Sequence, residues 1–131
     1  MELDVVIRLN RKVRALGEKI RRLKETQQSL VPVIDGMPKS RGRGTSRLED
    51  LATRIMTLEE ELNAVADALI ASAVDLAFEI IERVPYPMTD ILIMRYVGLK
   101  KFKQIVSTSG YTEPHVYYLH AQGVKVFKAA S

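Results

Sequence analysis

FKQIVSTSGYTEPHVYYL, residues 102–119, predicts two short helices joined by a tight turn. Apolar side chains mark the buried faces of both helices and stand at Phe102, Ile105, Val106, Val116 and Leu119. Gly110 falls between the helices, where the turn requires a residue that tolerates a left-handed backbone. Thr112 is a suitable N-cap for the second helix, which we expect to run to about residue 127. The stretch is therefore predicted to be helical on both sides of a defined turn.

The spacing of these positions is that of a helix-turn-helix, in which the second helix enters the major groove of DNA. A further short helix is predicted just before it, from Met88 to about Val97. Ser109 occupies a turn position that is usually apolar, so we expect it to loosen the turn. Residues 85–131 should form a C-terminal three-helix domain that contains the helix-turn-helix and binds DNA.

Two long amphipathic helices are predicted ahead of this domain. Apolar residues of the first follow the seam of a coiled coil at Val6, Leu9, Val13, Leu16, Ile20 and Leu23. Those of the second lie at Leu48, Leu51, Ile55, Leu58, Leu62, Val65 and Leu69, and resume at Leu76. We expect Ser46 to cap the second helix, with Glu49 as its capping-box partner, and Pro85 to stop it after Arg83. Residues 1–84 should thus form a long antiparallel helical hairpin.

Residues 29–46 contain two prolines and three glycines and predict a basic Gly/Pro loop between the long helices. Its Arg-Gly-Arg-Gly stretch is either a phosphate contact or a solvated linker. A lone two-helix hairpin buries little surface, so we expect the chain to form a homo-oligomer, with a dimer as the first expectation. The sequence allows the two long helices to pair either within one chain or between two chains.

The net charge of +4 is divided into blocks along the chain. Residues 1–28 carry +4, residues 29–46 carry +2, residues 47–84 carry −6 and residues 85–131 carry +4. The first helix and the second should attract each other through their charged flanks. The C-terminal charge has no acidic counterpart of its own, which favours nucleic acid as a partner.

A family resemblance rests on the residues of the C-terminal domain. They read RYVGLKKFKQIV at 95–106, GYTE at 110–113, HVY at 115–117 and LH at 119–120. These stretches resemble the C-terminal end of the RinA/ArpU-like group of small phage and prophage transcription regulators. The helix-turn-helix of that group resembles region 4 of bacterial sigma factors. The resemblance implies sequence-specific binding of double-stranded DNA, regulation of phage transcription, and a place in the host bacterial cytoplasm or nucleoid.

The candidate DNA contacts fall into two sets. Lys100, Lys101 and Lys103 crowd the start of the first helix of the motif, where they would hold phosphates without reading sequence. The outer face of the following helix should carry the residues that approach the bases, namely Thr112, His115, Tyr118 and Gln122. Tyr117 is a further candidate, with packing against the first helix of the motif as its alternative.

Several other classes of function find no support in the sequence. There is no cysteine, no glycine-rich phosphate loop after a strand and no marked Ser/His/Asp set, so we expect neither an enzyme nor a cofactor. His115 and His120 are five residues apart, about 140° around a helix, so they do not predict a metal site. No apolar run reaches the roughly 18 residues of a membrane helix, so we expect a cytoplasmic protein without a membrane partner.

Two alternative functions fit the same sequence. A small terminase or DNA-packaging subunit would keep the DNA contact and assemble as a ring. A protein-interaction module would bind RNA polymerase or a sigma factor, and it is favoured by Glu113 and Pro114, which stand where sigma region 4 carries basic residues. The operator sequence and the direction of regulation are not encoded in any pattern that we find.

Overall fold

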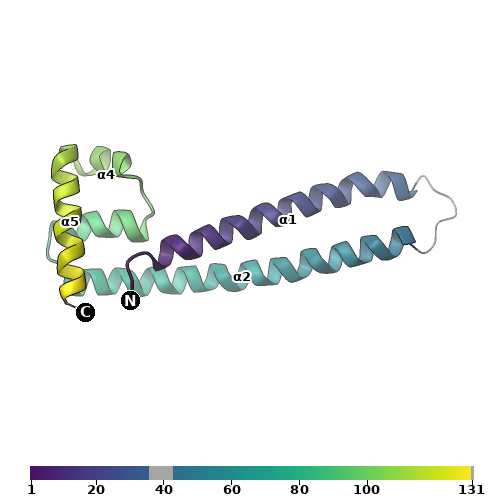
Figure 1. Cartoon of the computed structure of the whole chain (residues 1–131), viewed down its shortest axis with the longest axis horizontal. Helices are drawn as coiled ribbons and strands as arrows, with labels where there is room; N and C mark the ends of the chain where they lie inside the picture. The colour runs from purple at the N-terminus through teal and green to yellow at the C-terminus, as the bar shows by residue number, and fades with distance from the viewer. Residues whose placement is uncertain (36–42, 131) are drawn as a thin grey trace. The chain divides into compact units, whose positions relative to one another are not determined.

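The computed structural model describes the backbone of residues 1–35 and 43–130, and these residues contain helices and no strands (Figure 1). The helices are α1 (Val5–Asp35), α2 (Arg43–Arg83), α3 (Met88–Leu92), the π-helical η1 (Ile93–Val97), α4 (Phe102–Ser109) and α5 (Glu113–Ala129). The predicted all-α class is confirmed. Within the described ranges, no helix has the length and apolar character needed to cross a bilayer.

The chain divides into two compact units, which we name and describe separately. The paired-helix unit is Asn10–Asp67, and the C-terminal unit is Met1–Leu9 together with Ala68–Ser131. The predicted division into residues 1–84 and 85–131 differs from this one. The reason is that the last turns of α2 supply core residues to the C-terminal unit, as described below.

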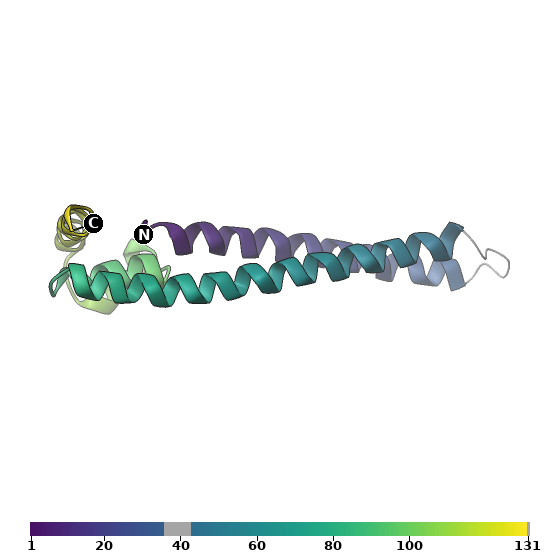
Figure 2. The ribbon, with the colours of Figure 1, turned by 90° about the horizontal axis from the view of Figure 1, so that it is seen from below.

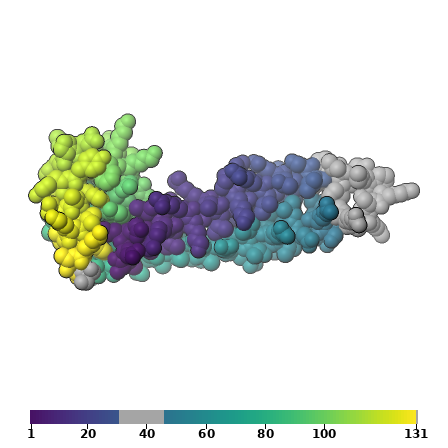
Figure 3. Space-filling view, viewed as in Figure 1, coloured from purple at the N-terminus to yellow at the C-terminus, as the bar shows by residue number. Residues whose placement is uncertain are grey.

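In the paired-helix unit, α1 and α2 run side by side in opposite directions (Figures 1 and 2). Ile20 of α1 and Ile55 of α2 are the buried side chains of this unit. The other seam positions are half-buried, namely Val13, Leu16, Leu23, Leu48, Leu51, Leu58, Leu62 and Val65. In the space-filling view the atoms of the two helices meet (Figure 3). The predicted apolar seam is therefore the packing face, and an ion pair of 3.7 Å between Lys24 Nζ and Glu59 Oε1 flanks it.

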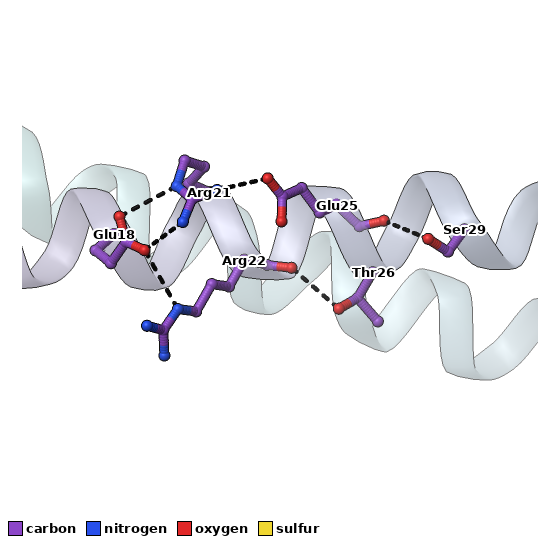
Figure 4. Close-up of polar contacts among 6 residues, drawn as sticks. All are labelled: Glu18, Arg21, Arg22, Glu25, Thr26 and Ser29. Atoms are coloured by element: carbon purple, nitrogen blue, oxygen red, sulfur yellow. Dashed lines mark hydrogen bonds and ion pairs between the residues drawn. The ribbon is translucent and has the colours of Figure 1, made fainter.

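Exposed polar pairs follow the outer surface of α1 (Figure 4). Arg21 donates to the carboxylates of Glu18 and Glu25, with 2.6 Å between Arg21 Nη1 and Glu25 Oε1. The hydrogen bond from Arg21 is the main cause that lowers the pKa of Glu18. Such exposed pairs contribute little to stability. The hydroxyls of Thr26 and Ser29 donate to carbonyl oxygens four residues earlier, each at 3.0 Å, so these residues continue the helix instead of ending it.

The predicted loop over residues 29–46 is wrong at both ends. α1 continues to Asp35 through Pro32, and α2 begins at Arg43, which places Ser46 inside a helix and not at its N-cap. Pro32 has no N–H to donate and removes one helical hydrogen bond, so the sequence predicts an end of the helix that the backbone does not show. Residues 36–42, with the first part of the Arg-Gly-Arg-Gly stretch, lie outside the described residues.

The C-terminal unit has two adjoining apolar clusters. The first joins distant parts of the chain and contains Leu3, Val6, Leu76, Ile80, Val84, Leu92 and Phe127. The second is formed by α3, α4 and α5 and contains Ile91, Ile105, Val116 and Leu119. The end of α2 therefore shares one core with α3 and α5.

α2 ends at Arg83, as the prolines predict. The chain then turns, with the hydroxyl of Thr89 donating to the carbonyl of Val84 and a cis peptide bond between Tyr86 and Pro87. The predicted single helix from Met88 to Val97 is divided, because η1 is π-helical. Its wide turn closes with a bond of 2.8 Å from the Gly98 N–H to the Ile93 carbonyl.

Candidate nucleic-acid interface

The turn between α4 and α5 is closed by the residues that the sequence places there. Gly110 has φ of 76°, and its N–H donates to the Val106 carbonyl at 3.2 Å. Ser109 does not loosen the turn. Its hydroxyl accepts a hydrogen bond from the Tyr111 N–H at 3.3 Å and donates to the Val106 carbonyl at 3.5 Å. The Ser109 hydroxyl therefore holds the turn through hydrogen bonds, where an apolar side chain would hold it through packing.

The start of α5 is fixed by its cap. The Thr112 hydroxyl accepts from the His115 N–H at 3.4 Å, and Pro114 lies in the first turn. The predicted cap is confirmed. Val116 and Leu119 are buried against Ile105 of α4, so the rotation of α5 about its axis is set by the core. The opposite face of α5 consequently points to solvent.

The lysine segment before α4 is held by Arg95. The Arg95 Nη1 donates to the Lys100 carbonyl at 3.1 Å, and its guanidinium carbon lies 4.8 Å from the Phe102 ring centroid. The Lys101 N–H donates to Gln104 Oε1 at 2.9 Å, which caps α4. We did not predict a role for Arg95, because no local spacing links it to a carbonyl five residues later.

An open concavity lies along α4. It is lined by Lys100, Lys103, Gln104, Ser107 and Thr108. Two ammonium groups and three neutral polar side chains are the groups that bind phosphate oxygens in protein–DNA complexes. Lys101 is exposed but does not line this concavity. The structure thus brings together two of the three predicted phosphate-contacting lysines.

Aromatic side chains connect α4, α5 and η1. The Phe102 ring stacks on Tyr117, with 4.8 Å between centroids, and meets the edge of His120 at 5.0 Å. His120 Nε2 lies 2.7 Å from the Tyr96 hydroxyl. Burial lowers the pKa of His120, and the nearby charge of Arg95 lowers it further. Tyr117 therefore takes the packing role that the sequence allowed, while 47% of its surface stays exposed.

The outer face of α5 carries most of the predicted base-contacting residues. Thr112, His115 and Tyr118 are exposed, whereas Gln122 is half-buried. The rings of His115 and Tyr118 stack with 6.4 Å between centroids.

Lys125 is exposed on the same side of α5 as Tyr118, because seven residues make two helical turns. We did not predict Lys125 as a candidate contact, although its seven-residue spacing from Tyr118 places both side chains on one face of a helix.

Charged side chains are unevenly distributed over α4, α5 and the segment before α4. Glu113 lies in the first turn of α5, where it stabilises the helix dipole but repels phosphate. The cations stand instead before and within α4, at Lys100, Lys101 and Lys103, and late in α5, at Lys125. The positive charge of this surface therefore lies beside the first turn of α5 and not on it.

Among the residues that the structure describes, no group of three or more His, Asp or Glu side chains is placed to hold a metal ion. Comparison with protein-family models, with curated proteins and with solved structures finds no match to this chain.

Proposed function

We propose that this protein is a DNA-binding transcription regulator that holds duplex DNA with α4, the Gly110 turn and α5. The proposal rests mainly on the turn between α4 and α5. A left-handed glycine joins two short helices whose buried residues fix α5 with Tyr118 and Lys125 facing solvent. This is the arrangement by which a helix-turn-helix presents its second helix to the major groove.

The lysines supply the electrostatic part of the contact. Lys100 and Lys103 line the concavity along α4, and Lys101 is exposed beside it. Contacts of this kind set the register of the protein on the duplex and make the affinity fall steeply with salt. Arg95 acts as a positioning residue here, because it holds the backbone of Lys100.

The exposed face of α5 supplies the contacts to bases. His115 and Tyr118 can approach a thymine methyl or a phosphate, and Gln122 can pair with an adenine edge. Thr112 lies where the helix begins and fits a phosphate contact. Tyr117 contributes through its exposed half, while its stacking on Phe102 holds α4 against α5.

The phage or prophage setting rests on the resemblance to the RinA/ArpU-like regulators. With it we propose the finer architecture: an antiparallel coiled-coil hairpin, a sigma-region-4-like helix-turn-helix, no catalytic activity and a place in the bacterial cytoplasm. The opposite directions of α1 and α2 and their half-buried seam support the hairpin.

A protein-interaction module that binds RNA polymerase or a sigma factor is the second candidate. One observation favours it. Glu113 stands in the first turn of α5, and a recognition helix inserts its N-terminal residues into the major groove, where a carboxylate adds negative charge close to the DNA. Pull-down of host polymerase at a salt concentration where no DNA binding is measured would support this candidate over the first.

The test is fluorescence anisotropy with random duplex DNA at about 50 to 200 mM salt. We expect micromolar binding that weakens with salt, and a shallower salt dependence when Lys100, Lys101 and Lys103 are all changed to alanine. The matched control changes Lys12, Arg14 and Lys19, which are exposed on α1, to alanine and removes the same charge.

If the control variant loses binding as strongly as the triple-lysine variant, the contact is not made by the helix-turn-helix. If the unmodified chain does not bind at about 50 mM salt, the DNA-binding proposal is wrong.

A further inference from the structure

An exposed apolar stripe runs along α2 within the C-terminal unit. It consists of Ile70, Val74, Phe78 and Ile81, whose exposed fractions are 62%, 50%, 63% and 58%. Their spacing of four, four and three residues places all four side chains on one face of the helix, over about three turns. Four large apolar side chains in one exposed row are more than scattered surface residues, which need no explanation.

The opposite face of the same stretch is the core of the C-terminal unit. Leu76 and Ile80 have exposed fractions of 0%. α2 is therefore apolar on two opposite sides here, which is typical of a helix that is buried in the assembled protein. Three to ten residues before the stripe, the same face carries the exposed polar residues Glu60, Asn63 and Asp67. Met56, 62% exposed and two heptads before Ile70, lies on this face too, but it is separated from the stripe by these polar residues.

We propose that this stripe is the interface with a second copy of the chain, and that the two α2 helices pack in parallel. Ile70, Val74, Ala77 and Ile81 fit a heptad in which Val74 and Ile81 take the a positions. In parallel coiled coils, β-branched residues at a favour assembly of two strands.

Parallel packing brings both copies of α3–α5 to the same end of the paired helices. A two-fold symmetric pair of recognition helices reads two half-sites of duplex DNA. This step rests on the proposed function, whereas the interface itself does not.

The length of the stripe limits the strength of the dimer. Twelve residues span about 17 Å of helix. A standard stable interface buries about 800 Å² on each partner, which is more than four side chains supply. We therefore expect a dimer that dissociates on dilution.

Sedimentation of the full chain without DNA tests the interface. We expect the mass to rise from one to two chains with concentration, over the micromolar range. Val74→Glu with Phe78→Glu should remain monomeric throughout, because both changes bring charges to the interface. Both side chains are exposed in the single chain, so circular dichroism should show unchanged helicity. Leu30→Glu, at an exposed position of α1, is the control and should dimerise normally.

The chain has no cysteine, so a single introduced thiol reports the direction of packing. Ile81→Cys should form disulfide-linked dimers in a parallel pair. In an antiparallel pair, the Ile81→Cys variant would form a disulfide only with the Ile70→Cys variant when the two proteins are mixed. That result would overturn the parallel arrangement.

A monomer at all concentrations would overturn the proposed interface, and so would a dimer that persists in the Val74→Glu/Phe78→Glu variant. A dimer that binds no DNA would leave the interface standing and remove the proposed function.

Discussion

The hydroxyl of Tyr96 lies 2.7 Å from Nε2 of His120, which ties η1 to the middle of α5. The two rings also stack, with 5.6 Å between their centroids. This pair links the position of α5 to the protonation of one imidazole.

Acid is expected to destabilise the C-terminal unit through His120. Burial, and then the charge of Arg95, lower the pKa of His120 below its ordinary value of 6.5, so the unfolded chain binds the proton more readily than the folded one. The stabilising effect of the neutral ring is fully present above pH 6.5 and is lost as the pH falls below it. Urea unfolding at pH 7.5 and pH 5.5 measures this loss.

His120→Asn should reduce the difference in unfolding free energy between these two pH values. The control is His115→Asn, at an exposed position, which should keep the difference. Equal pH dependence in both variants would show that His120 does not carry the effect.

Gly123 is expected to tolerate no larger side chain. A Cβ at this position would lie 3.1 Å from Cγ and 3.2 Å from Cδ1 of Leu92, so this fully buried side chain would have to shift. Gly123→Val should lower the unfolding free energy by about 1–3 kcal/mol, measured by denaturation followed by circular dichroism. Gly17→Val is the matched control, because a Cβ there meets nothing within 4 Å. A loss of similar size at both glycines would contradict close packing of α5 on α3.

Gly110→Ala is expected to cost about 1–2 kcal/mol of stability, because its φ of 76° is strained for an L side chain. No atom lies within 4 Å of the added Cβ, so steric contact does not contribute. Gly110→Asn should recover part of the loss, since asparagine adopts the left-handed region more readily than alanine. Equal stability of the alanine variant and the unmodified chain would mean that the turn relaxes to another conformation.

Arg95→Lys is expected to weaken DNA binding several-fold while leaving its salt dependence unchanged. Lysine keeps the charge but lacks the planar group that lies over Phe102 and reaches the Lys100 carbonyl. Lys103→Ala should behave differently, because the loss of one phosphate contact reduces the salt slope by about 1. Anisotropy titrations at several salt concentrations separate the two effects. A reduced slope for Arg95→Lys would indicate that Arg95 contacts phosphate directly.

Local spacing predicts the parts of this structure that depend on near neighbours. The seam from Val13 to Leu23, the left-handed Gly110 and the Thr112 cap are each determined within a few residues, and each is found as predicted. The end of α2 at Arg83 follows from the prolines for the same reason.

Features that depend on distant contacts were not predicted. Leu76 and Val84 belong to a core completed by Phe127, more than forty residues later, so no local pattern marks the boundary of the unit. Arg95 lies only five residues from the Lys100 carbonyl that it binds, yet no spacing pattern in the sequence indicates this bond. The extension of α1 to Asp35 is a different error, because Pro32 predicts a break and the helix continues through it.

The core that joins α2 to α5 determines where the chain can be divided. The prolines after Arg83 look like a natural place to cut, and a fragment beginning at residue 85 would contain α3, η1, α4 and α5 in full. Such a fragment would leave Leu92 and Phe127 without Leu76, Ile80 and Val84, and would expose apolar surface that aggregates. Any exchange of this domain between proteins, in the laboratory or by recombination, must carry the last turns of α2 and a substitute for Leu3 and Val6 with it.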